Sequence, residues 1–204
     1  MKVGIVPLNS SNFRSISRAM SWIDIECVFI NNRNELNNVS HLILPGVSSF
    51  GSVMNELISR DLIEDIEKLK EKGLPILGLC AGMQIMGDSS EESPGVAGLR
   101  WFEYRSEAIK PNSDLGVRSF HTGWNDVYAH GKNLIASLPG VFYFNHSFYV
   151  QKLHENEIFG KTEHGQIFAS VVRKDNIIGA QFHPEKSQSK GLGFLRDFIN
   201  LAYD

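Results

Sequence analysis

Cys80 and His183 have the chemistry and the setting of a nucleophile and its base. Cys80 is the centre of Gly78-Leu79-Cys80-Ala81-Gly82, which directly follows an apolar run. A sharp turn from strand to helix crowds the backbone, and glycine fits there without a Cβ clash. The pattern therefore predicts a nucleophile elbow with cysteine at its tip, where the helix N-terminus favours a thiolate. The alternative is that Cys80 is a small core residue.

His183 follows the apolar run 177–182 and precedes Pro184-Glu185. Proline pushes the residue before it toward extended conformations, in which residues two apart point the same way. Glu185 would then lie beside the imidazole, fix its tautomer and stabilise its protonated form, as the third member of a nucleophile-base-acid triad. A purely structural role is the alternative. Two such features at separate strand ends of one sheet favour catalysis.

Alternating strands and helices in the first half must position these groups. Buried strands are expected at 2–8, 27–30, 41–44 and 74–79. Between them, the apolar spacing predicts a helix over 13–22. It also predicts one long amphipathic helix from Phe50 to Leu69, with Ser48 or Ser49 as its cap and Gly73 at its end.

This order predicts the α/β class, with a central, mostly parallel sheet covered by helices on both faces. Ligands of such sheets lie beyond the carboxyl ends of the strands. The turn at 9–12, the corner at 45–48 and the bend at Cys80 should therefore surround one crevice. The second half has shorter strand signals at 142–150, 167–173 and 177–183, and a last helix that carries Leu192 and Phe198. We expect a single domain over 1–204.

Composition excludes several classes of function. The chain has 204 residues and a net charge of -3, without a basic block for nucleic acid. No apolar run approaches the roughly 20 residues of a membrane span. Two distant cysteines, Cys27 and Cys80, indicate a reduced, cytoplasmic setting, with Cys27 in the core. We expect no metal site and no cofactor, because paired Cys or His ligands and a phosphate-binding Gly-Lys loop are lacking.

Two segments, 75–84 and 181–187, resemble the signatures of class I glutamine amidotransferases. Three further segments, 44–47, 121–125 and 142–147, are similar to the glutaminase subunits of imidazole glycerol phosphate synthase, from histidine biosynthesis. The resemblance covers nearly the whole chain. It implies an enzyme that hydrolyses L-glutamine to glutamate and ammonia, and ammonia delivery to a separate, barrel-type synthase chain. The complex as a whole would be a lyase and a heterodimer.

The resemblance also implies roles for individual residues. Cys80 would attack the side-chain amide, His183 would protonate the departing ammonia and then activate water, and Glu185 would orient His183. The remaining roles are an oxyanion hole from the N–H groups of Val47 and Ala81, a substrate site at Gly46, Gln84, Glu92, His146 and Ser147, and a partner interface at Asn12, Trp124 and Lys186. For Glu92 the alternative is a solvated charge, for Trp124 a core position, and for Lys186 simple exposure.

Four positions depart from the family pattern. Ser48 replaces a usual glycine, the turn at 9–12 lacks its usual glycines, Phe120 stands in place of proline, and Ala81 replaces a common leucine. The triad is untouched, so the departures bear on the partner and on the acceptor of ammonia. A related subunit that supplies ammonia to a sugar of a surface polysaccharide is therefore the main alternative. A cysteine hydrolase of the same fold is a second one.

Overall fold

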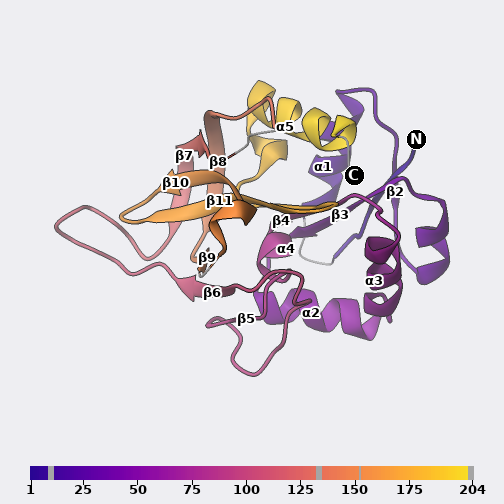
Figure 1. Ribbon diagram of the computed structural model, residues 1–204, viewed down its shortest axis with the longest axis horizontal. Helices are drawn as coiled ribbons and strands as arrows, with labels where there is room; N and C mark the ends of the chain where they lie inside the picture. Colours follow the sequence, from indigo (N-terminus) through magenta and orange to yellow (C-terminus); the bar gives the residue numbers. More distant parts are fainter. Residues whose placement is uncertain (9–11, 132–134, 152, 202–204) are drawn as a thin grey trace.

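The chain folds around a large mixed sheet (Figure 1). The computed structural model describes residues 1–8, 12–131, 135–151 and 153–201. Within these residues, nine strands form the sheet, parallel from β2 to β12 and antiparallel from β12 to β8. In spatial order they are β2 (Cys27–Phe29), β1 (Val3–Ile5), β3 (His41–Gly46), β4 (Ile76–Cys80), β12 (Ile177–Ala180), β11 (Ile167–Lys174), β10 (Ile158–Glu163), β7 (His121–Ala129) and β8 (Gly140–His146).

Helices cover both faces of the parallel half, as expected. Figure 1 shows α1 (Phe13–Ser21) and α5 (Gln188–Asn200) on one side, with α2 (Phe50–Ser59) and α3 (Ile63–Glu71) on the other. The short helix α4 (Ala81–Gln84) follows β4 directly. Three 3-10 turns complete the described helices: η1 (Arg33–Asn38), η2 (Glu155–Glu157) and η3 (Pro184–Lys186).

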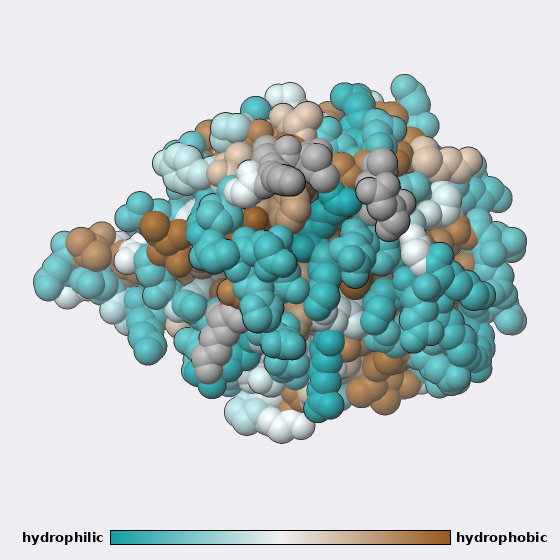
Figure 2. Space-filling model, in the orientation of Figure 1, coloured by the Kyte–Doolittle hydropathy of each residue, from teal (hydrophilic) through white to brown (hydrophobic). Residues whose placement is uncertain are grey.

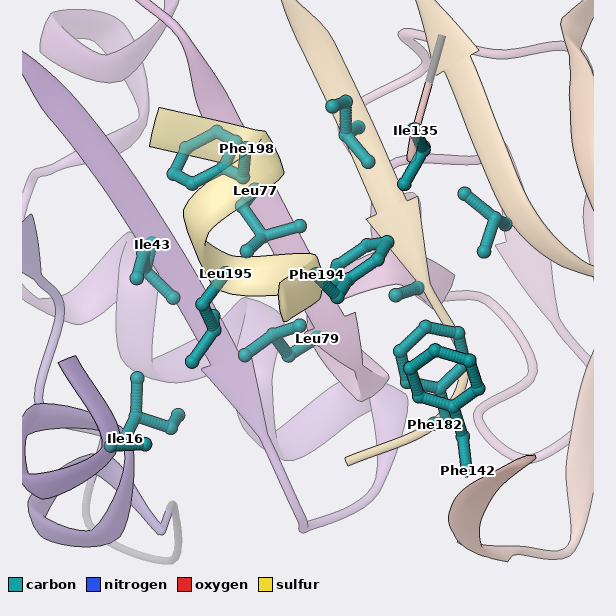
Figure 3. Close-up of a cluster of buried hydrophobic side chains, with 14 of the residues drawn as sticks. Ile16, Ile43, Leu77, Leu79, Ile135, Phe142, Phe182, Phe194, Leu195 and Phe198 are labelled. Carbon is teal, nitrogen blue, oxygen red and sulfur yellow. The ribbon is translucent and has the colours of Figure 1, made fainter. Parts of the chain in front are cut away.

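Two hydrophobic cores lie on the two faces of the sheet. Ile43 and Leu77 point toward α1 and α5, whereas their chain neighbours Leu42 and Ile76 point toward α2 and α3. This is the period-two alternation of a strand that is buried on both faces. Figure 3 shows Phe194, Leu195 and Phe198 of α5 packed over the strands. Beside them Phe142 stacks on Phe182, with ring centroids 4.1 Å apart, and this contact joins the antiparallel half to the segment before His183.

The predicted long helix over 50–69 is wrong in one respect, because the chain forms two helices there. Asp61 has a φ of 52°, which no helix interior adopts, and α2 ends at Ser59 with Arg60 as its C-cap. The guanidinium of Arg60 donates to the carbonyls of Pro7 and Ile30, so the break lies where this side chain reaches the strand ends. Ser49 caps α2 as predicted, and its Oγ accepts the N–H of Ser52 at 3.3 Å.

The second half contains more strands than its apolar runs predict. The expected strand at 142–150 is two strands, because the chain leaves the large sheet at Ser147 and β9 (Phe148–Gln151) joins a small sheet. The other described strands of that small sheet are β5 (Ser89–Ser90) and β6 (Arg105–Ala108). Strands β7 and β10 are not predicted, since HTGWNDVYA and IFGKTE have neither a long apolar run nor a regular alternation of polar and apolar residues.

The loop from β6 to β7 projects from one end of the molecule (Figure 1). In Figure 2 the visible face is largely hydrophilic, with small hydrophobic groups scattered over it and on this projection. Leu115 of the loop is 66% exposed. Across the described ranges, no helix has the length and apolar character that crossing a membrane requires.

Candidate active site

Cys80 lies at the end of β4 and immediately before α4, in a strained backbone conformation. Its φ of 54° and ψ of -112° are unusual for a residue with a side chain. Such geometry costs on the order of 1–3 kcal/mol and persists where the surroundings enforce it. The glycines allow it: a Cβ at Gly78 would lie 2.6 Å from the Gly82 carbonyl oxygen, and a Cβ at Gly82 would collide with the Leu44 carbonyl. The predicted elbow is present.

The neighbouring strand β3 brings a second backbone corner to Cys80. Gly46, the last residue of β3, is the register partner of Cys80, and a Cβ on it would lie 2.7 Å from the Cβ of Ala81. Val47 follows directly, and its side chain is 45% exposed. The corner at 46–47 and the first residue of α4 therefore both lie beside Cys80, and the oxyanion role of the Val47 and Ala81 N–H groups stays a prediction.

His183 and Glu185 form a buried pair near the end of β12. The two side chains are 3% and 1% exposed, and His183 Nδ1 donates to Glu185 Oε1 at 2.9 Å. The pairing was predicted, but its geometry differs from the prediction. The chain is not extended through Glu185, because Pro184 starts the turn η3 and His183 alone keeps an extended backbone. The turn brings the carboxylate back toward the imidazole.

The charges around His183 favour its protonated form. Burial lowers the pKa of His183, but the negative sulfur of Cys80 and then the Glu185 carboxylate raise it from 6.5 to about 10. Among the described residues, His183 Nε2 has no hydrogen-bond partner. The attraction between the imidazolium and the sulfur of Cys80 is therefore a charge interaction across the site. The free Nε2 proton is then available to a leaving group.

Asn12 is a further partner of Glu185. Its Nδ2 donates to Glu185 Oε1 at 3.1 Å, the same oxygen that accepts from His183. Burial raises the pKa of Glu185, and the hydrogen bonds from His183 and Asn12 lower it more, so the net direction is downward. Asn12, predicted at the partner interface, thus also holds the triad carboxylate. The turn residues 9–11 before it lie outside the described residues.

An open pocket of about 260 Å³ lies beside Cys80. It contains most of the predicted substrate and oxyanion residues. Its lining consists of Val47, Ser48, Ser49, Cys80, Ala81, Gln84, Glu92, Phe120, Asn145, His146, Ser147 and Phe148. A second, narrower recess brings Gly46 and Val47 together with Asn12, His183 and Glu185. Ser48 and Phe120, two of the departures from the family pattern, therefore face the substrate pocket.

Gln84 and Glu92 offer oxygen acceptors to this pocket. Both hydrogens of the Gln84 amide are used, because Nε2 donates to the Phe148 carbonyl at 2.9 Å and to Gln181 Oε1 at 3.2 Å. Only its Oε1 is left for a ligand. Glu92 accepts the Phe50 N–H at 2.7 Å through Oε2, at the start of α2. The alternative of a merely solvated charge is therefore wrong for Glu92, and both residues suit a bound ammonium group.

His146 supports the pocket wall through its buried ring. Nδ1 donates to the Phe148 carbonyl at 2.8 Å, so Nε2 must accept, and it takes the Nδ1 proton of His121 at 3.0 Å. Burial, and next the neighbouring ring of His121, lower the pKa of His146 to about 3. Burial, and next His164, lower the pKa of His121 to about 4. Both rings are neutral at physiological pH, which the sequence did not predict.

The other two predicted interface residues, Trp124 and Lys186, both contact the half-buried ring of Tyr143. Trp124 is 49% exposed, so the alternative of a core position is wrong. It contacts Tyr143 edge to face at a centroid distance of 5.9 Å, and Lys186 Nζ lies 5.4 Å from the same ring. Neither residue lines the pocket. Cys27, expected in the core, is only half-buried and packs at its margin.

Gln181 and Asn145 are site residues that the sequence analysis missed. Gln181 Nε2 donates to Cys80 Sγ at 3.6 Å, and Sγ lies 3.8 Å from the Asn145 carbonyl oxygen, to which it donates only in its protonated, thiol form. A signal for Gln181 was present, because it precedes His183 by two residues and residues two apart on an extended chain share a face. No sequence signal marks Asn145, whose contact uses the backbone.

Comparisons with known proteins identify the family of this chain. The family model described as "Glutamine amidotransferase class-I" matches residues 5–201. A protein of Methanocaldococcus jannaschii named imidazole glycerol phosphate synthase subunit HisH is 38% identical, over 98% of this chain and 99% of its own. Proteins of the same name from Leptospira borgpetersenii and Bacillus subtilis are 34% and 32% identical, and each match again covers 98% of this chain, with 100% and 96% of the relatives.

Solved structures agree on the fold. A crystal structure of a glutamine amidotransferase superposes with a TM-score of 0.75 at 21% identity, covering 98% of this chain and 97% of that one. The PurLQS structure from Thermotoga maritima gives a TM-score of 0.72 at 18% identity, with the same coverage. At these identities the likeness concerns the fold alone. From the family model and the curated relatives together, this chain belongs to the class I glutamine amidotransferases, within the family of the HisH subunits of imidazole glycerol phosphate synthase.

Proposed function

We propose that this chain is the glutaminase subunit of an imidazole glycerol phosphate synthase, with Cys80, His183 and Glu185 as its catalytic residues. The observation that carries the proposal is that Cys80 lines a pocket whose remaining polar groups suit glutamine, while the paired His183 and Glu185 line the adjoining recess, which shares Val47 with that pocket. An amidase of another specificity would not need acceptors such as Gln84 and Glu92 in the pocket of the nucleophile. Relatives under the same name favour the histidine pathway over transfer to a sugar.

The reaction begins with attack of the Cys80 thiolate on the side-chain amide carbon. The carbonyl oxygen becomes an oxyanion, which the N–H groups of Val47 and Ala81 would stabilise; one such donor is worth about a hundred- to a thousandfold in rate. As the C–N bond breaks, His183 gives its Nε2 proton to the departing nitrogen, and ammonia leaves. The products of this half-reaction are a thioester on Cys80 and a neutral His183.

Water completes the cycle. His183, held by Glu185, takes a proton from the water molecule while its oxygen attacks the thioester carbon. The C–S bond breaks, glutamate leaves, and the thiolate and the protonated imidazole are restored. In the pocket, Gln84 Oε1 and the Glu92 carboxylate would bind the ammonium group of the substrate. Backbone N–H groups of the segment 146–147 would bind its carboxylate.

Ammonia would pass to a separate, barrel-type cyclase chain. The exposed Trp124, packed against Tyr143, supports a protein interface there, because Trp and Tyr are enriched at interface centres. Lys186, beside the same Tyr143 ring, would lie at the polar rim of this interface. With a net charge of -3, we include neither nucleic acid nor membrane among the partners. A reducing cytoplasm would keep Cys80 in its reduced state, free of disulfides.

The test is glutamate release from L-glutamine by the purified chain, with and without a cyclase subunit of an imidazole glycerol phosphate synthase. We expect release that the cyclase increases, and none from L-asparagine, whose amide is one methylene closer to the backbone. If the cyclase has no effect on glutamate release and a sugar amidotransferase increases it, the acceptor of ammonia is a sugar and not the substrate of the cyclase. No release under any condition would contradict the glutaminase proposal.

A further inference from the structure

Gln181 touches the nucleophile, yet the mechanism above gives it no role. Its Nε2 lies 3.6 Å from Cys80 Sγ, and the residue is completely buried. It does not line the substrate pocket. A buried polar side chain needs hydrogen-bond partners, so the question is whether Gln181 merely satisfies its neighbours or acts on the sulfur.

The hydrogen-bond network fixes which way the Gln181 amide points. A backbone carbonyl can only accept, so the Gln84 atom that lies 2.9 Å from the Phe148 oxygen must be its NH₂ nitrogen. The second hydrogen of that nitrogen points to Gln181 at 3.2 Å, which must therefore present its oxygen. The nitrogen of Gln181 is left for the sulfur. The orientation of the Gln181 amide thus follows from the donors and acceptors around it. It does not require that the amide oxygen and nitrogen be told apart by their positions.

The Phe148 carbonyl is itself held from the other side. His146 Nδ1 donates to it at 2.8 Å, and His121 Nδ1 donates to His146 Nε2 at 3.0 Å. Asn125 Nδ2 completes the series by donating to His121 Nε2 at 3.1 Å. Each ring therefore has one possible neutral tautomer. Two series of donors therefore meet at the Phe148 carbonyl oxygen. One comes from Asn125 through His121 and His146, and the other is the Gln84 amide, which is linked through Gln181 to Cys80.

We propose that Gln181 is a further catalytic residue, whose side-chain N–H donates a hydrogen bond to the Cys80 thiolate. This inference rests on the proposed function. The bond stabilises the sulfur when it carries negative charge, before attack and when it leaves the thioester carbon. It is weakened while the sulfur is bonded to carbon. Gln181 therefore raises the thiolate fraction and assists the step in which the C–S bond breaks.

The alternative is that Gln181 has a structural role and only accepts the hydrogen bond from Gln84. Two substitutions at position 181 distinguish this role from donation to the sulfur. Gln181→Glu keeps the shape and the oxygen that accepts from Gln84, but its ionised form cannot donate to sulfur. Gln181→Met removes donor and acceptor together. A structural role predicts that Gln181→Met loses stability but keeps the native titration of Cys80, whereas a donor to the thiolate predicts a raised midpoint in both variants. Gln151→Glu, on the half-buried strand β9, is the matched control for an added charge.

The first readout is the ultraviolet absorbance of the Cys80 thiolate as a function of pH, taken as the difference from Cys80→Ala. A hydrogen bond to a charged group predicts an upward shift of the titration midpoint by about one pH unit or more in Gln181→Met. We expect a larger shift in Gln181→Glu, because the carboxylate repels the thiolate. The Gln151→Glu control should titrate like the native chain. This readout does not involve glutamine, so it stands even if the glutaminase proposal fails.

The second readout is steady-state glutamate release. Both Gln181 variants should lose about tenfold or more in kcat with little change in KM, because Gln181 does not contact the pocket. In Gln181→Glu the deficit should grow with pH, since only the protonated carboxyl can donate. Native midpoint and native kcat in Gln181→Glu would overturn the proposal.

A third measurement leaves Gln181 unchanged, in case the variants do not fold. The side-chain amide protons of Gln181 in the ¹⁵N-labelled native chain should shift as Cys80 titrates, and this pH dependence should be lost in Cys80→Ala. Amide resonances that do not respond to the state of Cys80 would overturn the proposal as well.

Discussion

The parallel and antiparallel halves of the large sheet differ in the freedom of their functional side chains. In the parallel half, Cys80 is held by glycines whose Cβ atoms would collide with backbone, and His183 and Glu185 are almost completely buried. In the antiparallel half, Trp124 is half-exposed and its described ring contact is with Tyr143 alone. Chemistry thus lies where the backbone is crowded, and the proposed partner surface lies where side chains remain open to solvent.

The two halves meet at Tyr143 of β8. Its carbonyl accepts the N–H of His183 at 2.8 Å, and its own N–H donates to Ser187 Oγ at 2.9 Å. Ser187 Oγ in turn donates to the His183 carbonyl at 2.6 Å. A partner that binds around the Tyr143 ring therefore contacts the strand that supports the catalytic histidine. The following changes test how far this division between the halves extends.

Cys80→Ala should have the largest effect. Loss of a covalent nucleophile typically costs about 10⁴-fold or more, so glutamate release should fall to background. The thermal unfolding midpoint should change little, because one sulfur at an open pocket contributes about 1 kcal/mol or less. Cys27→Ala is the control and should retain activity. Glutamate release by Cys80→Ala at more than a few per cent of the native rate would exclude this residue as the nucleophile.

A glutamine analogue with an electrophilic carbon separates the two cysteines directly. Burial and, next, the charge of Glu26 raise the pKa of Cys27 to about 11. About 1 in 10⁴ of these side chains is then a thiolate at neutral pH, too few for rapid alkylation. We expect peptide mass spectrometry to find the label on Cys80 and not on Cys27. Equal labelling would indicate general exposure in place of an activated site.

Glu185→Gln should have the next largest effect, about a hundredfold on kcat. The neutral amide no longer stabilises the imidazolium and can favour the wrong tautomer of His183. It should also change stability with pH. Folding raises the pKa of His183 from 6.5 to about 10, so this contribution is complete below 6.5 and is lost as the pH rises toward 10. Folding lowers the pKa of Glu185 from 4.5, so its contribution is complete above 4.5 and is lost as the pH falls through its lowered pKa.

Urea unfolding of Glu185→Gln against pH checks this directly. The stability deficit should be greatest between about pH 4.5 and 6.5 and should shrink as the pH rises above 6.5. The charge of the Cys80 sulfur, which is the first cause of the raised pKa of His183, is retained in this variant, so Glu185 accounts for only part of the shift. Glu163→Gln, at the end of β10 and away from the triad, is the control and should show no such window. A deficit that is constant over the whole range would mean that the buried ion pair does not contribute to folding.

Much of the parallel half could be predicted from the sequence because its signals are local. Continuous apolar runs mark β3 and β4, and Gly78 and Gly82 mark the turn between β4 and α4. The helix break at Asp61 could not be predicted, since the apolar spacing continues through it. It depends on Arg60 reaching carbonyls of Pro7 and Ile30, which are distant in sequence.

Only the site residues that lie within short sequence motifs could be predicted. Cys80, His183 and Glu185 lie in short patterns, whereas the bond from Gln181 to sulfur depends on Gln84 and Phe148 from other elements. Pairing of His183 with Glu185 was predicted through an extended chain, and the turn η3 achieves it instead. A motif thus identifies which groups meet more reliably than how the backbone brings them together.

Trp124→Ala should have an intermediate effect, confined to the partner-dependent rate. Removing an aromatic side chain from an interface centre costs about 2 kcal/mol, or roughly thirtyfold in the cyclase concentration needed for half-maximal stimulation. Release without cyclase should not change. Trp22→Ala is the matched control, because Trp22 is 67% exposed at the other end of α1 from Asn12. Equal effects of the two substitutions would place the interface elsewhere.

Ser48→Gly should have the smallest effect. It tests the pocket in which residues after β3 of the parallel half face residues 145–147 at the end of β8. Ser48 follows Val47 at the corner that would supply one oxyanion donor, and it lines the substrate pocket. The peptide between Gly46 and Val47 must turn its N–H toward the pocket, and a missing donor costs about a hundred- to a thousandfold. We therefore expect the free chain to be a poor glutaminase that its cyclase activates.

Glycine at position 48 lets the corner visit both orientations at lower cost, because it removes the Cβ restriction on the residue after Val47. Release by the free chain should then rise by about a few-fold, since freedom shifts an equilibrium by less than 1 kcal/mol. The cyclase-stimulated rate should stay constant, because the partner already selects the productive orientation. Ser49→Gly, which removes the cap of α2 instead, is the control for local loosening. If Ser48→Gly lowered the free rate and left the stimulated one unchanged, serine would be holding the donor in place, and the free chain would owe its activity to that residue.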